Sequence, residues 1–260
     1  MEEAHRRGIL SAASLMVGAP AAADAVKRAR ALPSLRVGLH VVLVDGDPIL
    51  PAAQIPALAD ASGRLPNALV GVSVRSAVSP SLRRQIGAEI AAQFEAFRAT
   101  GLPLDHVNTH RHFHLNPIVA ASIVRIGRLY GMRALRVPFE PWRIVAEIDP
   151  QTRRLAGRIV APWAAFMRHC VRRAGLITAD AVFGLAWSGA MTKSRLVSLL
   201  GRLPAGFVEI YLHPATNNAF ADAAPGYRYA DEFAALCDAD CIAAARRSGY
   251  AIGGYVDANT

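Results

Sequence analysis

The chain has 260 residues, 53% of them hydrophobic and 19% charged, with a formal net charge of +9. This composition excludes disordered and collagen-like proteins and allows one large domain with a substantial core. The arginines are scattered in pairs without a run of five, so no nucleic-acid partner is expected. The three cysteines lack the spacing of a zinc ribbon or a disulfide framework, which favours a reducing compartment.

The N-terminal stretch "HRRGILSAASLMVGAPAAA" imitates a secretory signal. Glu2 and Glu3 interrupt its basic part, however, and Ser11, Ser14 and Gly18 interrupt its apolar part. No other stretch approaches the roughly 18 to 20 apolar residues that a membrane helix requires. We therefore expect a cytoplasmic protein, whose positive charge would allow peripheral contact with an anionic inner-membrane surface.

Short apolar segments alternate with helical segments along the chain. In order, the patterns predict strand 8–17, helix 21–32, strand 35–44, helix 79–101, strand 104–110, helix 117–130, strand 134–137, helix 155–174, strand 207–212, helix 231–247 and strand 250–253. Residues 45–66 and 138–154 are predicted loops, the first long enough for a lid. This alternation favours one α/β domain of barrel type over residues 1–260.

The predicted strand ends carry the polar residues that matter in such a barrel. His110, His112 and His114 alternate, and in an extended chain they would project to one side, where three imidazoles can converge on a divalent ion. A strand merely rich in histidine is the alternative. Glu209 and His213 are expected to share a face, where the carboxylate would tune the imidazole for proton transfer. The alternative is that Glu209 pairs with one of the arginines.

Three motifs, "GLH" (38–40), "VNTHRHFH" (107–114) and "VEIYLHP" (208–214), resemble signatures of the YdjC-like carbohydrate deacetylases, and the resemblance covers essentially the whole chain. The stretches "LSAASLMVGAPAAADAV", "VFGLAWSGAMT" and "EIYLHPAT" are most similar to the hopanoid-biosynthesis-associated branch, HpnK, in which Asn108 replaces an aspartate. The resemblance implies a distorted (β/α) TIM-like barrel that deacetylates an N-acetylglucosaminyl hopanoid glycolipid. A deacetylase of soluble N-acetylated oligosaccharides and a non-catalytic barrel that binds a glycolipid or a protein are the alternatives.

The resemblance also implies roles for individual residues. The family's divalent metal, Mg²⁺ or Zn²⁺, is held by one aspartate and two histidines, and the histidine positions map to His40 and His110. His213, oriented by Glu209, is the candidate catalytic acid. Substrate-binding or supporting roles are implied for four further residues, His112, His114, Arg136 and Trp187, although a buried core position is the alternative for Trp187.

One departure from the family pattern concerns the N-terminus. The family opens with a strand followed by "ADDFG", whose aspartates supply a general base and the third metal ligand, whereas this sequence begins with "MEEAHRRGIL". We therefore expect the family's first strand to be missing, through a start site assigned at an internal Met or a truncated gene. Two imidazoles without a carboxylate bind a hard ion poorly, and an open barrel exposes unpaired edges. The chain as written is expected to be inactive or nearly so, and prone to aggregate.

Overall fold

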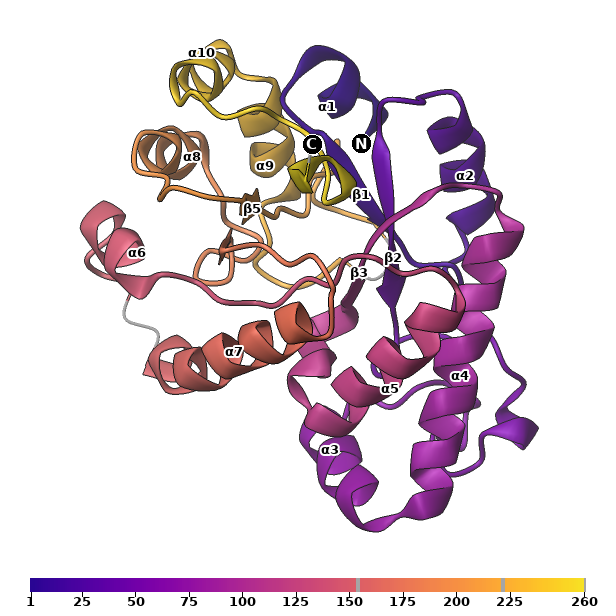
Figure 1. The fold of residues 1–260 in the computed structure, drawn as a ribbon. Helices are drawn as coiled ribbons and strands as arrows, with labels where there is room; N and C mark the ends of the chain where they lie inside the picture. Colours follow the sequence, from indigo (N-terminus) through magenta and orange to yellow (C-terminus); the bar gives the residue numbers. More distant parts are fainter. Residues whose placement is uncertain (153–154, 221–222, 260) are drawn as a thin grey trace.

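The computed structural model describes residues 1–152, 155–220 and 223–259. Parallel strands form a row that curves through the molecule, with helices packed outside it (Figure 1). The strands are β1 (Ala12–Leu15), β2 (Arg36–Val41), β3 (Leu104–Thr109), β4 (Ala181–Phe183) and β5 (Val208–Ile210). One sheet has the order β1-β2-β3 and the other pairs β4 with β5, while single parallel bridges, Val107–Leu135 and Ala134–Ile177, continue the row between them. The expected α/β class is confirmed, and the arrangement is that of a distorted barrel.

The helices cover the outer face of this row. They are α1 (Glu2–Arg7), α2 (Ala22–Arg30), α3 (Leu69–Val78), α4 (Pro80–Ala99), α5 (Pro117–Leu129), α6 (Trp142–Ile148), α7 (Leu155–Arg173), α8 (Lys193–Leu200), α9 (Tyr229–Cys237) and α10 (Ala239–Arg247), with short 3-10 turns η1 (Ala52–Gln54), η2 (His110–Leu115) and η3 (Val256–Asn259). Across the described residues, no helix is both long enough and apolar enough to span a bilayer.

Helix caps explain why two predicted helices lie where the sequence places them. Ser79 accepts a hydrogen bond from the Leu82 amide at 3.2 Å and is followed by Pro80, so α4 begins there. Asn116 accepts from the Ile118 amide at 2.9 Å and begins α5 in the same way. These local signals are strong because each satisfies an amide that the helix itself leaves unpaired.

Several predicted boundaries are wrong. The segment 8–17 forms a strand only over β1 and is preceded by the short helix α1, while α3 and α6 lie after and within the two predicted loops. The helix expected over 231–247 is two helices, because the Asp238 carboxylate accepts the amides of Asp240 and Cys241 and starts a new one. Segment 134–137 makes only isolated bridges. These differences fall where local capping or loop packing competes with an ambiguous apolar pattern.

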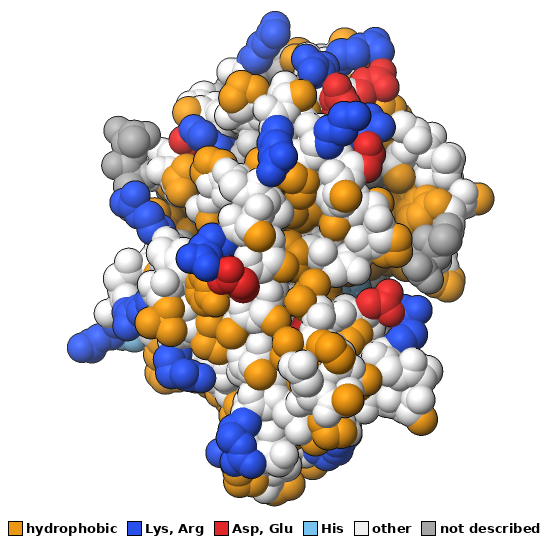
Figure 2. Space-filling view, turned by 90° about the vertical axis from the view of Figure 1, so that its right-hand side faces the viewer, with side chains coloured by type: hydrophobic (Ala, Val, Ile, Leu, Met, Phe, Trp, Pro, Cys, Tyr) orange, Lys and Arg blue, Asp and Glu red, His pale blue; other side chains and the backbone are white. Residues whose placement is uncertain are grey.

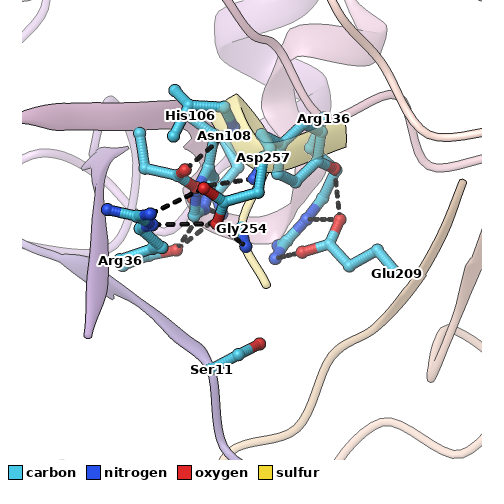
Figure 3. Close-up of polar contacts among 12 residues, drawn as sticks. Ser11, Arg36, His106, Asn108, Arg136, Glu209, Gly254 and Asp257 are labelled. Carbon is cyan, nitrogen blue, oxygen red and sulfur yellow. Dashed lines mark hydrogen bonds and ion pairs between the residues drawn. The ribbon is translucent and has the colours of Figure 1, made fainter. Parts of the chain in front are cut away.

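The strand expected at 250–253 does not form; side chains hold the C-terminal segment instead. Ser11 donates to the Gly253 carbonyl at 2.7 Å, and the Asp105 carboxylate accepts the Tyr255 amide at 3.1 Å. Arg36 pairs with Asp257, with 2.9 Å between Nε and Oδ2 (Figure 3). This segment therefore contacts residues at the amino ends of β1, β2 and β3 without adding a strand to the sheet.

Candidate active site

The carboxyl ends of β2 and β3 bring His40 and His110 together. The His40 Nε2 and His110 Nδ1 atoms lie 3.5 Å apart, and the two rings meet edge to face with centroids 5.6 Å apart. Parallel strands present their carboxyl ends on one side of a barrel, which is where such folds assemble functional side chains. The pair that the motifs indicated is therefore adjacent in space, although 70 residues separate its members.

The alternating histidines do not lie on a strand, as the sequence pattern had predicted. Strand β3 ends at Thr109, and η2 follows it, with Arg111 and His112 in the left-handed region at φ 52° and 53°. His112 turns toward Tyr211, with 3.3 Å between Nε2 and the hydroxyl. His114 is fully buried, with its Nδ1 2.6 Å from the Thr109 hydroxyl, so it supports the turn and is not exposed to a substrate. Two successive left-handed residues other than glycine are costly, and such strain gathers at functional sites.

Asp45 is a site residue that sequence reasoning left in a loop. Its carboxylate lies 4.0 Å from His110 Nε2 and 3.5 Å from the Arg111 guanidinium. It approaches the side of the His110 ring opposite to His40 and favours a proton on Nε2, leaving the Nδ1 lone pair directed at His40. The detectable signal was its position directly after the buried run Val41–Val44, at the same strand end as His40.

Asn108 lies between His40 and Arg136, and its amide has two orientations. In one, Oδ1 accepts from His40 Nδ1 at 2.5 Å, which leaves the His40 Nε2 lone pair free. In the other, Oδ1 accepts from Arg136 Nη1 at 3.0 Å and from Ser14 at 2.8 Å, and the amide nitrogen donates to His40 Nδ1. The second places the imidazole proton on Nε2. The orientation of Asn108 thus determines which nitrogen of His40 can accept a ligand.

Glu209 pairs with Arg136 rather than with His213, so the expected Glu209–His213 contact is wrong and the arginine alternative holds. Arg136 donates through Nε at 2.8 Å and through Nη2 to the two carboxylate oxygens (Figure 3). The Tyr255 hydroxyl donates to the same carboxylate. Both side chains are almost fully buried. Burial opposes ionisation of Glu209, but Arg136 holds its pKa below the usual range. The pair is a buried ion pair that joins β5 to the segment 134–137.

His213 is positioned through its backbone. Its amide donates to the buried Glu232 carboxylate, which also accepts the Met191 amide at 2.9 Å. Sequence reasoning gave Glu232 no role beyond opening the last helix, and its apolar surroundings in the sequence provided no further signal. The His213 ring lies against Tyr211 and Tyr227, with centroids 5.4 and 5.2 Å away.

Burial keeps the imidazoles of the site neutral. It lowers the pKa of His40 to about 3 and that of His213 to about 4, and the positive charge of Arg136 adds to the effect at both. For His110, burial lowers the pKa while Asp45 opposes the shift. Neutral imidazoles can bind a metal ion or accept a proton, but they cannot act as acids until they have gained one.

Trp187 is a core residue. Its side chain is 2% exposed, packs in the apolar cluster around β4 and α8, and donates to the Thr152 hydroxyl at 3.2 Å. The expectation that it contacts substrate is therefore wrong, and the buried alternative holds. A tryptophan buried with its N–H satisfied stabilises a core through its large apolar area.

A family model described as YdjC-like protein matches residues 1–247. The chain belongs to this family. Three of its relatives are named carbohydrate deacetylase. The protein from Geobacillus stearothermophilus is 29% identical over 93% of this chain and 83% of its own length. The protein from Brevibacillus brevis is 33% identical over 54% of this chain and 52% of its own length. The protein from Vibrio cholerae is 34% identical over 49% of this chain and 48% of its own length.

The fold of this chain is similar to that of a solved structure. A protein from Enterococcus faecalis V583, named for a proposed cellobiose-phosphate cleavage activity, superimposes with a TM-score of 0.76 at 21% identity, over 98% of this chain and 90% of that one. At this identity the likeness establishes the fold. It supports the expectation of a barrel.

The spacing of His40 and His110 fits two ligands of one divalent ion in this YdjC-like chain. Two nitrogens at about 2.1 Å from a tetrahedral zinc ion would lie about 3.4 Å apart, and the observed separation is 3.5 Å. Within the described ranges, no group of three or more His, Cys, Asp or Glu side chains is arranged to hold a metal. The donors present are two borderline nitrogens, which suit Zn²⁺ better than Mg²⁺.

Proposed function

We propose that the chain removes the acetyl group from an N-acetylated sugar, and that this sugar is N-acetylglucosamine carried on a hopanoid lipid. The paired imidazoles of His40 and His110 at the strand ends carry the proposal, together with relatives named carbohydrate deacetylase. The lipid carrier rests on the similarity of the motif stretches to the hopanoid branch, including Asn108.

His40 and His110 would hold a divalent ion, with Asp45 orienting His110 and Asn108 orienting His40. The chemistry that such an ion supplies is polarisation of the amide carbonyl and a lowered pKa for bound water. Binding through His40 Nε2 requires the Asn108 orientation in which Oδ1 accepts from His40. We therefore expect metal binding to draw Asn108 away from Arg136.

His213 would transfer the proton. Because its pKa is about 4, its ring is neutral near pH 7 and must first accept a proton. We propose that it takes this proton from the attacking water and returns it to the leaving amine. Glu232 fixes the position of the ring through the backbone, and Glu209 contributes only indirectly, by holding Arg136 in place. His112, at the mouth of the turn beside Tyr211, is proposed to contact the sugar.

Two imidazoles are a poor ligand set without a carboxylate on the metal, and this observation favours low activity for residues 1–260 when tested alone. It also keeps a second candidate, a barrel that binds a glycolipid without chemistry. The upstream nucleotides discriminate between the two. An in-frame strand that ends in two aspartates supports the enzyme, and a stop codon supports the non-catalytic barrel.

The direct test is acetate release in the presence of Zn²⁺. We would compare N-acetylglucosaminyl hopanoid in detergent micelles with a soluble N-acetylated oligosaccharide. We expect slow release from the lipid-linked sugar by residues 1–260 and faster release after in-frame extension by an aspartate-bearing strand. His110→Ala should abolish release, whereas His169→Ala, a matched change of an exposed histidine on α7, should leave it unchanged.

Each outcome decides a separate part of the proposal. An ordinary enzymatic rate from residues 1–260 would show that two imidazoles suffice. Faster turnover of the soluble oligosaccharide would refute the hopanoid carrier. No acetate release from either substrate, with or without the extension, would refute deacetylation and leave the binding barrel.

A further inference from the structure

Large apolar side chains are exposed unevenly over the molecule. Among the residues that the structure describes, eleven large apolar side chains are exposed, and six of these belong to α3 and α7. On α3, the row lies at intervals of four residues, with exposed fractions of 72%, 63% and 77%: Val70, Val74 and Val78. On α7, the row has exposed fractions of 69%, 37% and 56%: Ile159, Trp163 and Phe166. Both spacings place the side chains of a row on one helical face, which here points to solvent.

Contacts to the turn η2 place both helices beside the candidate site. Trp163 on α7 donates through Nε1 to the Leu115 carbonyl at 2.8 Å. The Ser76 hydroxyl on α3 accepts from the side-chain Nδ2 of Asn116, directly after the turn, at 3.4 Å. Helix α3 follows β2 in the chain, and α7 follows the bridge segment 134–137 and α6. We call the two exposed rows together the α3–α7 face.

The sequence around this face is basic. Residues 150–179, which include α7, contain six arginines and no aspartate or glutamate, and the next residue, Asp180, pairs with one of the six, Arg172, at 2.7 Å. Residues 67–88, which include α3, contain Arg75, Arg83 and Arg84 and again no acidic residue. In Figure 2, which views the molecule from the α4 side, the lower third shows hydrophobic and basic side chains but no acidic one.

We propose that the α3–α7 face docks on a bilayer that contains anionic lipids. An apolar helical row flanked by arginines is the pattern of helices that lie in a membrane interface, where a tryptophan can place its ring at headgroup depth. Each arginine near an anionic surface adds attraction that an acidic neighbour would cancel. Docking would bring His110 and His112 to the lipid surface. Docking itself needs neither metal nor catalysis, but its purpose, access to a lipid-borne sugar, rests on the proposed function.

The test is co-sedimentation of the full chain with vesicles, without metal or sugar. We expect binding to vesicles of phosphatidylcholine with about one-third phosphatidylglycerol, weaker binding to phosphatidylcholine alone, and further weakening as salt is raised. The triple variant Val70→Ser, Val74→Ser, Val78→Ser should bind at least about tenfold more weakly. Leu129→Ser is the matched control, because this side chain is 80% exposed but lies at the C-terminal end of α5 and belongs to neither row.

A second pair of variants tests the charge. Arg84→Gln, near the face, should weaken binding about fivefold, since one interfacial arginine contributes about 1 kcal/mol. Arg247→Gln, exposed at the end of α10, should have no effect. Circular dichroism confirms that each variant is folded.

The proposal is overturned if the wild type does not bind anionic vesicles, or if the valine variant and the Leu129 control bind equally. It is also overturned if light scattering without lipid finds a dimer that the valine variant disrupts, because the face would then bind a second copy. Acetate release that fails while vesicle binding persists would refute the proposed function alone.

Discussion

Removal of the Glu209 charge should destabilise the protein strongly, because it leaves a buried guanidinium without its counter-ion. The Arg136 and Glu209 side chains are only 9% and 14% exposed, and two charge-assisted hydrogen bonds join them. Breaking such a pair from one side costs about 3 to 5 kcal/mol. The entropy of unfolding is about 2.1 cal/mol/K per residue, which gives about 0.55 kcal/mol/K for 260 residues. Dividing the lost stability by this entropy, we expect Glu209→Gln to lower Tm by about 5 to 9 °C.

The assays are urea unfolding followed by circular dichroism and a calorimetric scan. The double variant Arg136→Met, Glu209→Leu should recover most of the lost stability, because it removes both charges together. Glu95→Gln breaks an exposed pair with Arg98 and should change little. Wild-type stability in Glu209→Gln, or a double variant as unstable as the sum of its single changes, would refute the structural role of the pair.

Three further predictions concern the site and its support. Burial lowers the pKa of His114 to about 4, so the contribution of His114 to stability should be constant above pH 6.5 and fall by about 3 kcal/mol toward pH 4. His114→Gln should therefore lose about 3 kcal/mol less than the wild type over this range in urea unfolding, and an equal loss contradicts burial of His114 as a cause. Trp187→Ala should lower the free energy of unfolding by about 3 to 5 kcal/mol in the same assay, whereas the more exposed Trp142→Ala should change it little. Similar losses in the two variants would count against a core role for Trp187. Asp45→Asn should weaken the Zn²⁺ affinity roughly 10- to 100-fold in calorimetry, whereas the control Asp47→Asn should not change it. An unchanged affinity in Asp45→Asn would exclude Asp45 as the group that orients His110.

The sequence predicts well those features that depend on neighbouring residues. The helices predicted over 79–101 and 117–130 begin where expected, because each start is fixed by a local hydrogen bond, to Ser79 and to Asn116. The cap signals do not depend on long-range packing. The pairing of His40 with His110, 70 residues apart, was expected only because the motifs resemble those of the family.

Features that depend on distant partners could not be predicted. An alternating "HRHFH" is typical of a strand, and only the tertiary structure makes Arg111 and His112 left-handed. Many arginines could have paired with Glu209, and packing selects Arg136, 73 residues away. The exposed valine row of α3 went unrecognised because an apolar stretch gives no indication in sequence of whether it faces a core or solvent.

Zinc titration of residues 1–260 tests the central claim, that His40 and His110 hold the ion of a deacetylase. Isothermal calorimetry near pH 7 should give one Zn²⁺ per chain, with binding lost in His40→Ala and His110→Ala and retained in His169→Ala. Wild-type binding that survives both site substitutions, or no zinc binding at all, would contradict the account.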